Sequence, residues 1–189
     1  MTKDLGKMTN EELGMLFPII IADPDPDWAI LYKVESGKIL KVLGREFVFG
    51  IEHIGSTAIP GIKAKPTIDI LMQIPDSANL EKIQEGLKSI DYQPIPRPEN
   101  PAPHMMFVKG YTINGFKGQA FHVHVRYRGD WDEPWFRDYL INNPSVAMEY
   151  ENLKISLSEK FKNDRDGYTE MKTDFVKRIN ILARNELKS

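Results

Sequence analysis

The chain has 189 residues, of which 41% are hydrophobic and 28% charged, and its formal net charge is -2. These values are typical of a soluble globular protein with one domain. The small net charge argues against general coating of DNA or RNA, which needs a large basic surplus. The absence of cysteine excludes disulfides, thiolate zinc sites and cysteine nucleophiles. The apolar run 16–22 is interrupted by Pro18 and is too short to span a membrane, so we expect a cytoplasmic protein with no membrane partner.

The first third of the chain predicts two helices and two strands. Thr9-Asn10-Glu11-Glu12 is a capping box and predicts a short helix that ends before Pro18. Residues 19–21 form either a short strand or an apolar strap. The proline-rich turn 23–27 precedes a longer helix that ends near Gly44. The side chains expected on the buried stripe of that helix are Trp28, Leu31, Val34, Ile39 and Val42. Two strands are predicted next, at 47–54 and 67–74.

The remainder predicts a helix, a hairpin and a helical end. Ser77 or Asn79 caps a helix whose inward residues are Leu80, Ile83, Leu87 and Ile90. Residues 94–103 are rich in proline and predict a rigid, extended loop. Asn114-Gly115 lies between two alternating runs, 104–113 and 116–127, which is a strong hairpin signal. Apolar spacings of three and four predict helices within 136–141, 150–161 and 168–182.

The segment between the first two predicted strands is rich in groups that bind phosphates and metals. Gly55 permits close approach to the backbone, and Ser56 offers a hydroxyl and an N–H group beside it. Asp69 interrupts an otherwise apolar strand, and a buried carboxylate is costly unless a cation or hydrogen bonds compensate it. This combination indicates a phosphate and metal site.

Strand parity places further polar groups beside Asp69. Side chains alternate between the two faces of a strand, so Asp69 shares a face with Thr67 and Leu71. In the last strand, His122, His124 and Arg126 share one face. If the two apolar faces pack on the same helices, the polar faces converge on one concavity, with Ser56 at its rim.

The segments EHIGSTAIPG (52–61) and KPTIDI (65–70) resemble the hallmark of the GrpB family. The resemblance extends from residue 25 to about residue 185. It implies an α+β fold of the nucleotidyltransferase-like superfamily, with a short mixed β-sheet, helices packed on one face and a helical C-terminal segment. It also implies a single domain over 1–189, divided into an N-terminal extension (1–22), an α/β core (23–130) and the helical segment (131–189).

The chain departs from the superfamily pattern at the residues expected to bind the metal. That pattern places two acids on one strand, separated by one residue, but Thr67 and Leu71 stand two residues either side of Asp69. A third acid, expected on a later strand, is replaced by His122 and His124. One carboxylate with two imidazoles suits zinc, manganese or iron better than a magnesium–triphosphate clamp. The family resemblance implies a divalent metal, either magnesium or manganese. Zinc is the alternative, because of the altered ligand set.

The candidate site residues fall into three groups, each with a structural alternative. The catalytic candidates are Asp69, His53, His122 and His124; the ligand-binding candidates are Gly55, Ser56, Thr57, Lys65, Arg126 and Lys172; the metal ligands are Asp69, His122 and His124. His53 is equally well interpreted as a satisfied core histidine. Glu52 points to the other side of its strand and is a minor candidate for the missing carboxylate. Lys65 is a better phosphate ligand candidate than Lys63, and an H-x-H pair is also common without any metal.

Three functions remain open. The first is a nucleotidyltransferase-like enzyme that binds a nucleotide or a phosphorylated small molecule and uses a divalent metal. The second is a catalytically inactive module that binds such a ligand or a partner enzyme. The resemblance to the family links it to coenzyme A metabolism. The third is a transition-metal enzyme that uses Asp69, His122 and His124 as its ligand set. The sequence does not indicate an oligomeric state.

Overall fold

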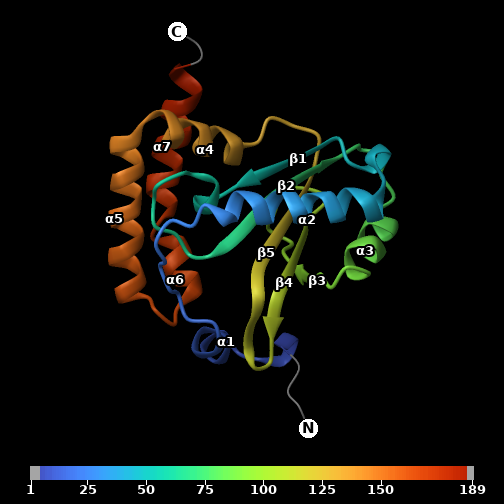
Figure 1. Ribbon diagram of the computed structural model, residues 1–189, viewed down its shortest axis with the longest axis horizontal. Coiled ribbons are helices and arrows are strands. Elements are labelled where there is room, and N and C mark those ends of the chain that lie inside the picture. Colours follow the sequence, from blue (N-terminus) through green and yellow to red (C-terminus); the bar gives the residue numbers. More distant parts are fainter. Residues whose placement is uncertain (1–4, 187–189) are drawn as a thin grey trace.

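The computed structural model describes residues 5–186 of the chain (Figure 1). Residues 1–4 and 187–189, the two ends of the predicted domain, lie outside the described residues, and the predicted division into segments stays a prediction. The helices and strands, in chain order, are α1 (Asn10–Leu16), α2 (Asp27–Leu43), β1 (Gly50–Ile54), β2 (Thr67–Ile74), α3 (Leu80–Lys88), β3 (Gln93–Pro96), β4 (Met105–Thr112), β5 (Gly115–Tyr127), α4 (Asp132–Asn142), α5 (Pro144–Lys160), α6 (Arg165–Glu170) and α7 (Thr173–Glu186). Short 3-10 helices lie at Leu5–Lys7, Arg45–Phe47 and Ser56–Ala58.

The five strands form one mixed sheet in the order β1-β2-β5-β4-β3. The central pair, β2 and β5, is parallel, and the other three pairs are antiparallel. The register pairs Asp69 with His122 and Leu71 with His124 across the parallel pair. The predicted α+β fold with a short mixed sheet is confirmed.

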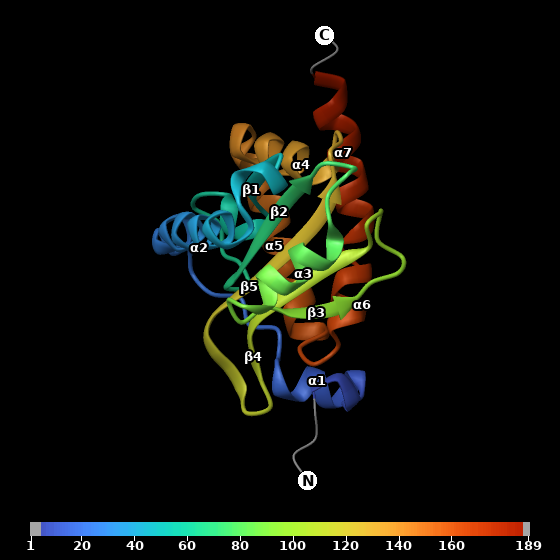
Figure 2. The same ribbon diagram turned by 90° about the vertical axis from the view of Figure 1, so that its right-hand side faces the viewer.

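One face of the sheet is apolar and is covered by α2 and α3 (Figure 2). The residues that alternate with the polar positions of β2 and β5 are buried in one cluster with residues of both helices: Ile68, Ile70, Met72, Ile74, Phe121, Val123 and Val125, with Tyr127 partly buried against it. Alternation along the strands then points Asp69, His122 and His124 to the opposite face, where no continuous apolar layer covers them. The parity argument is confirmed for both strands.

The C-terminal helices form a second cluster on the loop between β1 and β2. Ile59 and Ile62 of this loop are buried against Phe136, Leu140 and residues of α5 and α7. This contact fixes the Gly-Ser turn between the sheet and the helical segment. Among the described residues, no helix combines the length and the apolar character that crossing a bilayer requires.

The predicted stripe of α2 is wrong at two positions. Val34 and Val42 are 52% and 38% exposed, whereas Glu35 is 2% exposed. Glu35 can be buried because its carboxylate accepts hydrogen bonds from Lys109 Nζ (2.7 Å) and Lys38 Nζ (3.0 Å). Because this paired carboxylate is buried, the buried face of α2 differs from the purely apolar stripe predicted from the sequence.

Three local boundaries also differ from the sequence prediction, the first being the predicted helix 168–182, which the structure divides between α6 and α7. The predicted strand 47–54 is shortened, because Arg45–Phe47 is a 3-10 helix and β1 begins at Gly50. The segment 94–103, expected as loop throughout, contributes to the edge strand β3, where proline is tolerated. Residues 19–21 form a strap with no strand of their own, anchored where Ile19 N donates to Lys162 O (2.7 Å). The capping box at Thr9 and the hairpin around Asn114-Gly115 are confirmed.

Candidate functional site

The turn after β1 brings its backbone onto the Asp69 carboxylate. Gly55 has φ +73°, in the region that favours glycine, and a Cβ at this position would lie 2.7 Å from Asp69 Oδ2. The glycine therefore serves two purposes, the left-handed turn and the space for the carboxylate. The Ser56–Ala58 turn follows directly and places Ser56 beside Asp69 on the wall of the same cavity.

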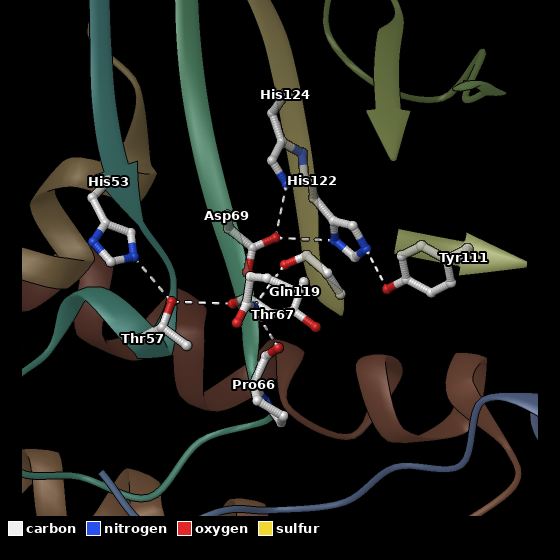
Figure 3. A network of polar contacts seen from close by, with 10 residues as sticks. His53, Thr57, Pro66, Thr67, Asp69, Tyr111, Gln119, His122 and His124 are labelled. Atoms are coloured by element: carbon white, nitrogen blue, oxygen red, sulfur yellow. Dashed lines mark hydrogen bonds and ion pairs between the residues drawn. The ribbon is translucent and has the colours of Figure 1, made fainter. Parts of the chain in front are cut away.

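Asp69, His122 and His124 form a compact polar group on the face of the sheet opposite α2 and α3 (Figure 3). Asp69 Oδ1 lies 3.1 Å from His122 Nδ1 and 3.2 Å from His124 Nε2. Tyr111 Oη lies 2.8 Å from the other ring nitrogen of His122 and fixes the orientation of that imidazole. Tyr111 belongs to β4, so three neighbouring strands build this group.

Protonation of the group follows from its burial and its hydrogen bonds. Burial alone would raise the pKa of Asp69, but hydrogen bonds from His122 and His124 outweigh it and hold that pKa well below its usual range. Burial lowers the pKa of His122 to about 4, although the contact with Asp69 opposes this change. At neutral pH the group therefore contains an ionised carboxylate and a neutral His122 imidazole, which is the form that binds a metal.

His53 lies apart from this group, on the face of β1 that contacts α2. Its ring stacks on Tyr32 with 4.8 Å between centroids. The Thr57 hydroxyl donates to Thr67 O (3.1 Å), so the 3.0 Å contact with His53 is a hydrogen bond that Nε2–H donates to Thr57 Oγ1. Burial lowers the pKa of His53 to about 4. Thr57 is itself buried, so these two residues support the turn from behind and do not line the cavity.

A cavity of about 650 Å³ opens beside Asp69, and we call it the basic cavity. Besides Arg97 after β3 and the acids Asp69, Glu99, Asp166 and Glu170, four cations line it: Lys65 before β2, Lys154 of α5, Arg165 of α6, and Lys172 between α6 and α7. Within residues 5–186, no carboxylate lies at ion-pair distance from any of these four side chains. Lys63 differs, because its Nζ contacts Asp23 Oδ1 at 2.9 Å on the surface.

Burial and the repulsion between neighbouring cations lower the pKa values of the lysines in the basic cavity. Burial, with repulsion from Arg165 and Lys172, lowers the pKa of Lys65 to about 8. Burial and Lys172 lower the pKa of Lys154 to about 7, and burial lowers that of Lys172 to about 8. Lys154 is 1% exposed and its Nζ donates to Lys63 O. A bound polyanion would relieve this repulsion.

A second cavity of about 660 Å³ adjoins the first, and we call it the aromatic cavity. Gly55 and Arg126 line it, together with rings from the C-terminal segment that include Trp131, Phe136 and Tyr150. Four residues line both cavities: Ser56, Asp69, His124 and Lys172. Asp69 and His124 therefore lie at the boundary between the basic cavity and the aromatic cavity.

The Asp69 group fits a divalent metal by its donor atoms. One carboxylate oxygen and two imidazole nitrogens lie within 4.8 Å of one another. Glu52, the alternative second acid, instead accepts a hydrogen bond from Arg137 Nη2 (3.2 Å). Leu71 is fully buried, so β2 supplies a single carboxylate. Such a set suits zinc, manganese or iron, and Tyr111 is placed to orient His122 from behind.

The sequence analysis missed four residues of the site: Tyr111, Tyr150, Lys154 and Arg165. Lys154 carried a signal, because it lies four residues after Tyr150 and three before Leu157, on the stripe predicted to be buried. A lysine at a buried helix position is rare unless it has a partner or a ligand. Arg165 and Tyr111 carried no local signal, because their positions depend on how distant elements pack.

The sheet, the glycine turn and the Asp69 group together define an α+β protein of nucleotidyltransferase-like architecture. The family model described as "GrpB protein" matches residues 18–181. This chain belongs to the GrpB family.

Relatives support this assignment. The chain is 37% identical over 164 residues to the "Glutamate-rich protein GrpB" of Alkalihalophilus pseudofirmus, with 85% of this chain and 93% of that protein covered. A crystal structure of the conserved protein GrpB from Enterococcus faecalis matches with a TM-score of 0.77 and 26% identity, over 90% of this chain and 100% of that one. A "Dephospho-CoA kinase" of Mycolicibacterium paratuberculosis is 23% identical over 178 residues, which cover 82% of this chain and 43% of that protein.

Proposed function

We propose that this protein binds a phosphorylated small molecule, such as a nucleotide, together with a divalent cation held by Asp69, His122 and His124. One observation carries the proposal: the wall that presents these three ligand groups also presents four cations without an ion-pair partner among the described residues. Burying several like charges is unfavourable unless a counter-charge arrives. A chain of phosphates supplies that counter-charge.

The roles of the individual groups follow from their positions. Lys65, Lys154 and Lys172 hold phosphate oxygens, and Ser56 adds a hydroxyl at the boundary of the two cavities. When bound, the cation would act as a Lewis acid on a phosphoryl oxygen. The Arg165 guanidinium lies 5.7 Å from the centre of the Tyr111 ring and donates to Phe17 O, which fixes its position beside the tyrosine that contacts His122.

The test separates metal binding from phosphate binding. Equilibrium dialysis with zinc and manganese should show one bound ion per chain in the parent. His122→Ala with His124→Ala should lose it, whereas His104→Ala, which changes an exposed histidine outside the group, should retain it. Calorimetry with inorganic tripolyphosphate should show binding that Lys65→Met and Lys172→Met weaken. A parent that binds neither probe would overturn the proposal.

Transfer chemistry is the candidate activity of this site. A nucleotidyltransferase would release pyrophosphate from a nucleoside triphosphate when the acceptor is present, and Asp69→Asn would abolish that release without unfolding the chain. The expected stabilisation by a bound ligand is about 2.7 kcal/mol at a hundred times its dissociation constant. Thermal unfolding therefore identifies the ligand before the acceptor is known.

A second candidate is a ligand-binding module without turnover. Two observations favour it: Thr67 and Leu71 are buried and neither is an acid, and the chain matches part of a protein named as a dephospho-CoA kinase. This candidate predicts stabilisation by coenzyme A precursors or nucleotides with no product formed under any metal. Product formation that Asp69→Asn abolishes would exclude it.

A further inference from the structure

The aromatic cavity contains two buried polar atoms that have no partner. Among the described residues, Arg126 Nε and Asn180 Oδ1 are buried and make no hydrogen bond. Both residues line the aromatic cavity. Arg126 is 4% exposed, and its Nη1 already donates to Val125 O (3.0 Å). An unpaired buried donor is unfavourable, so a ligand that accepts from Arg126 would complete the site.

The apolar walls of this cavity are flat rings held in place. Trp131 Nε1 donates to Tyr127 O (3.0 Å), and the Arg126 guanidinium lies 5.9 Å from the Trp131 ring centroid. Tyr150 packs edge-to-face on Phe136, with 5.1 Å between centroids. Fixed aromatic rings provide stacking surfaces for another planar ring.

The charges of the cavity favour an uncharged ring over an anion. Asp130, Asp132 and Glu133 also line it, and Glu133 is the acid that acts on the Arg126 charge. Asp130 and Asp132 accept hydrogen bonds from Arg184. A carboxylate or phosphate in this cavity would face four acids, Asp69 included, and two cations, whereas five cations and four acids line the basic cavity beside it.

We infer that the aromatic cavity binds an uncharged planar heteroaromatic ring, a nucleobase, belonging to the same ligand whose phosphates lie in the basic cavity. The inference rests on the proposed function. Arg126 donates to a ring acceptor, and the Asn180 amide, whose oxygen and nitrogen are interchangeable by rotation, reads the adjacent position of the ring. Ser56 and Asp69 lie where the two cavities meet, beside the sugar and the first phosphate.

The experiment compares inorganic tripolyphosphate with the four common nucleoside triphosphates by calorimetry, each with manganese. At least one nucleotide should bind about tenfold or more tightly than tripolyphosphate, because ring stacking adds to the phosphate contacts. Asn180→Ala and Trp131→Leu should each remove most of that difference and leave the tripolyphosphate affinity unchanged. Trp135→Leu is the matched control, since Trp135 does not line the cavity.

Three results distinguish the ways in which the inference fails. Equal affinities for tripolyphosphate and all four nucleotides in the parent would overturn the base site and leave the proposed function intact. Equal losses for both ligand types in Asn180→Ala and Trp131→Leu would also overturn it. No binding of any of these ligands would overturn the proposed function and this inference together.

Discussion

Replacing Lys154 by methionine should stabilise the ligand-free protein. Lys154 is 1% exposed, and its pKa falls from 10.5 to about 7. At about 1.4 kcal/mol per pH unit, the fully charged lysine costs roughly 5 kcal/mol in the folded state, and roughly 4 kcal/mol at pH 7, where about half of it is charged. Methionine keeps the length of the side chain and removes the charge. It also leaves Lys63 O without its donor, which costs about 1–3 kcal/mol. A net gain of about 1–3 kcal/mol at pH 7 follows.

The pH dependence of this gain checks its origin. A lysine with a depressed folded pKa imposes its full cost below that pKa, and the cost disappears as pH rises towards the unfolded pKa. The charging cost should therefore be nearly constant below pH 7 and fall by roughly half, about 2 kcal/mol, between pH 7 and pH 9, so that most of the advantage of Lys154→Met disappears over this range. Urea unfolding of parent and variant at several pH values measures it.

The same variant should lose function as it gains stability. Tripolyphosphate should stabilise the parent and have a much smaller effect on Lys154→Met. The control is Lys177→Met, which removes an exposed lysine of α7 and should change neither quantity. If Lys154→Met is less stable than the parent and still responds fully to tripolyphosphate, Lys154 is a structural residue and the reasoning is refuted.

Two further predictions test the turn and the charges. Gly55→Ala should lower the affinity for zinc about tenfold or more, because the new methyl group displaces Asp69, as measured by competition with a chelator. Gly61→Ala is its control: φ is +79° there and the methyl group meets nothing, so both variants should lose about 1 kcal/mol of stability but only the first should lose metal. Tripolyphosphate affinity should fall as pH rises from 7 to 9, since the pKa values of Lys65 and Lys172 are about 8 and their charged forms bind the anion. Calorimetry showing constant affinity over this range would contradict the assigned phosphate ligands.

The positions of the candidate site residues on the sheet were well predicted from the sequence. Alternation along two strands was enough to place Asp69, His122 and His124 together, because side-chain direction in a strand has a fixed period. Parity also placed His53 with Ile51, and the structure accordingly finds it on the α2 side, against Tyr32. Once two strands are known to pair, the alternation of their side chains determines which residues lie beside one another.

The candidate site residues on the C-terminal helical segment were not predictable in the same way. Lys154 and Arg165 reach the basic cavity because the C-terminal helices pack on Ile59 and Ile62, and nothing in a single helix specifies that orientation. Lys172 was a candidate through the family resemblance and not through a pattern in its predicted helix. The same limit applies to α2, where the predicted apolar stripe was wrong because Glu35 forms an ion pair with Lys109 of the distant strand β4. Long-range ion pairs have no signature in the spacing of apolar residues.

The parallel pairing of β2 with β5 has a consequence for synthesis of the chain. Asp69 and His122 are 53 residues apart, and the hairpin partner of β5 must also be in place. A nascent chain therefore has no Asp69 group until residues up to Tyr127 have left the ribosome and paired with β2. The four cations require α5 and α6 as well. Non-local pairing of this kind forms late and slowly, so a truncated or partly folded chain lacks the Asp69 group, and binding of the proposed ligand would require the complete fold.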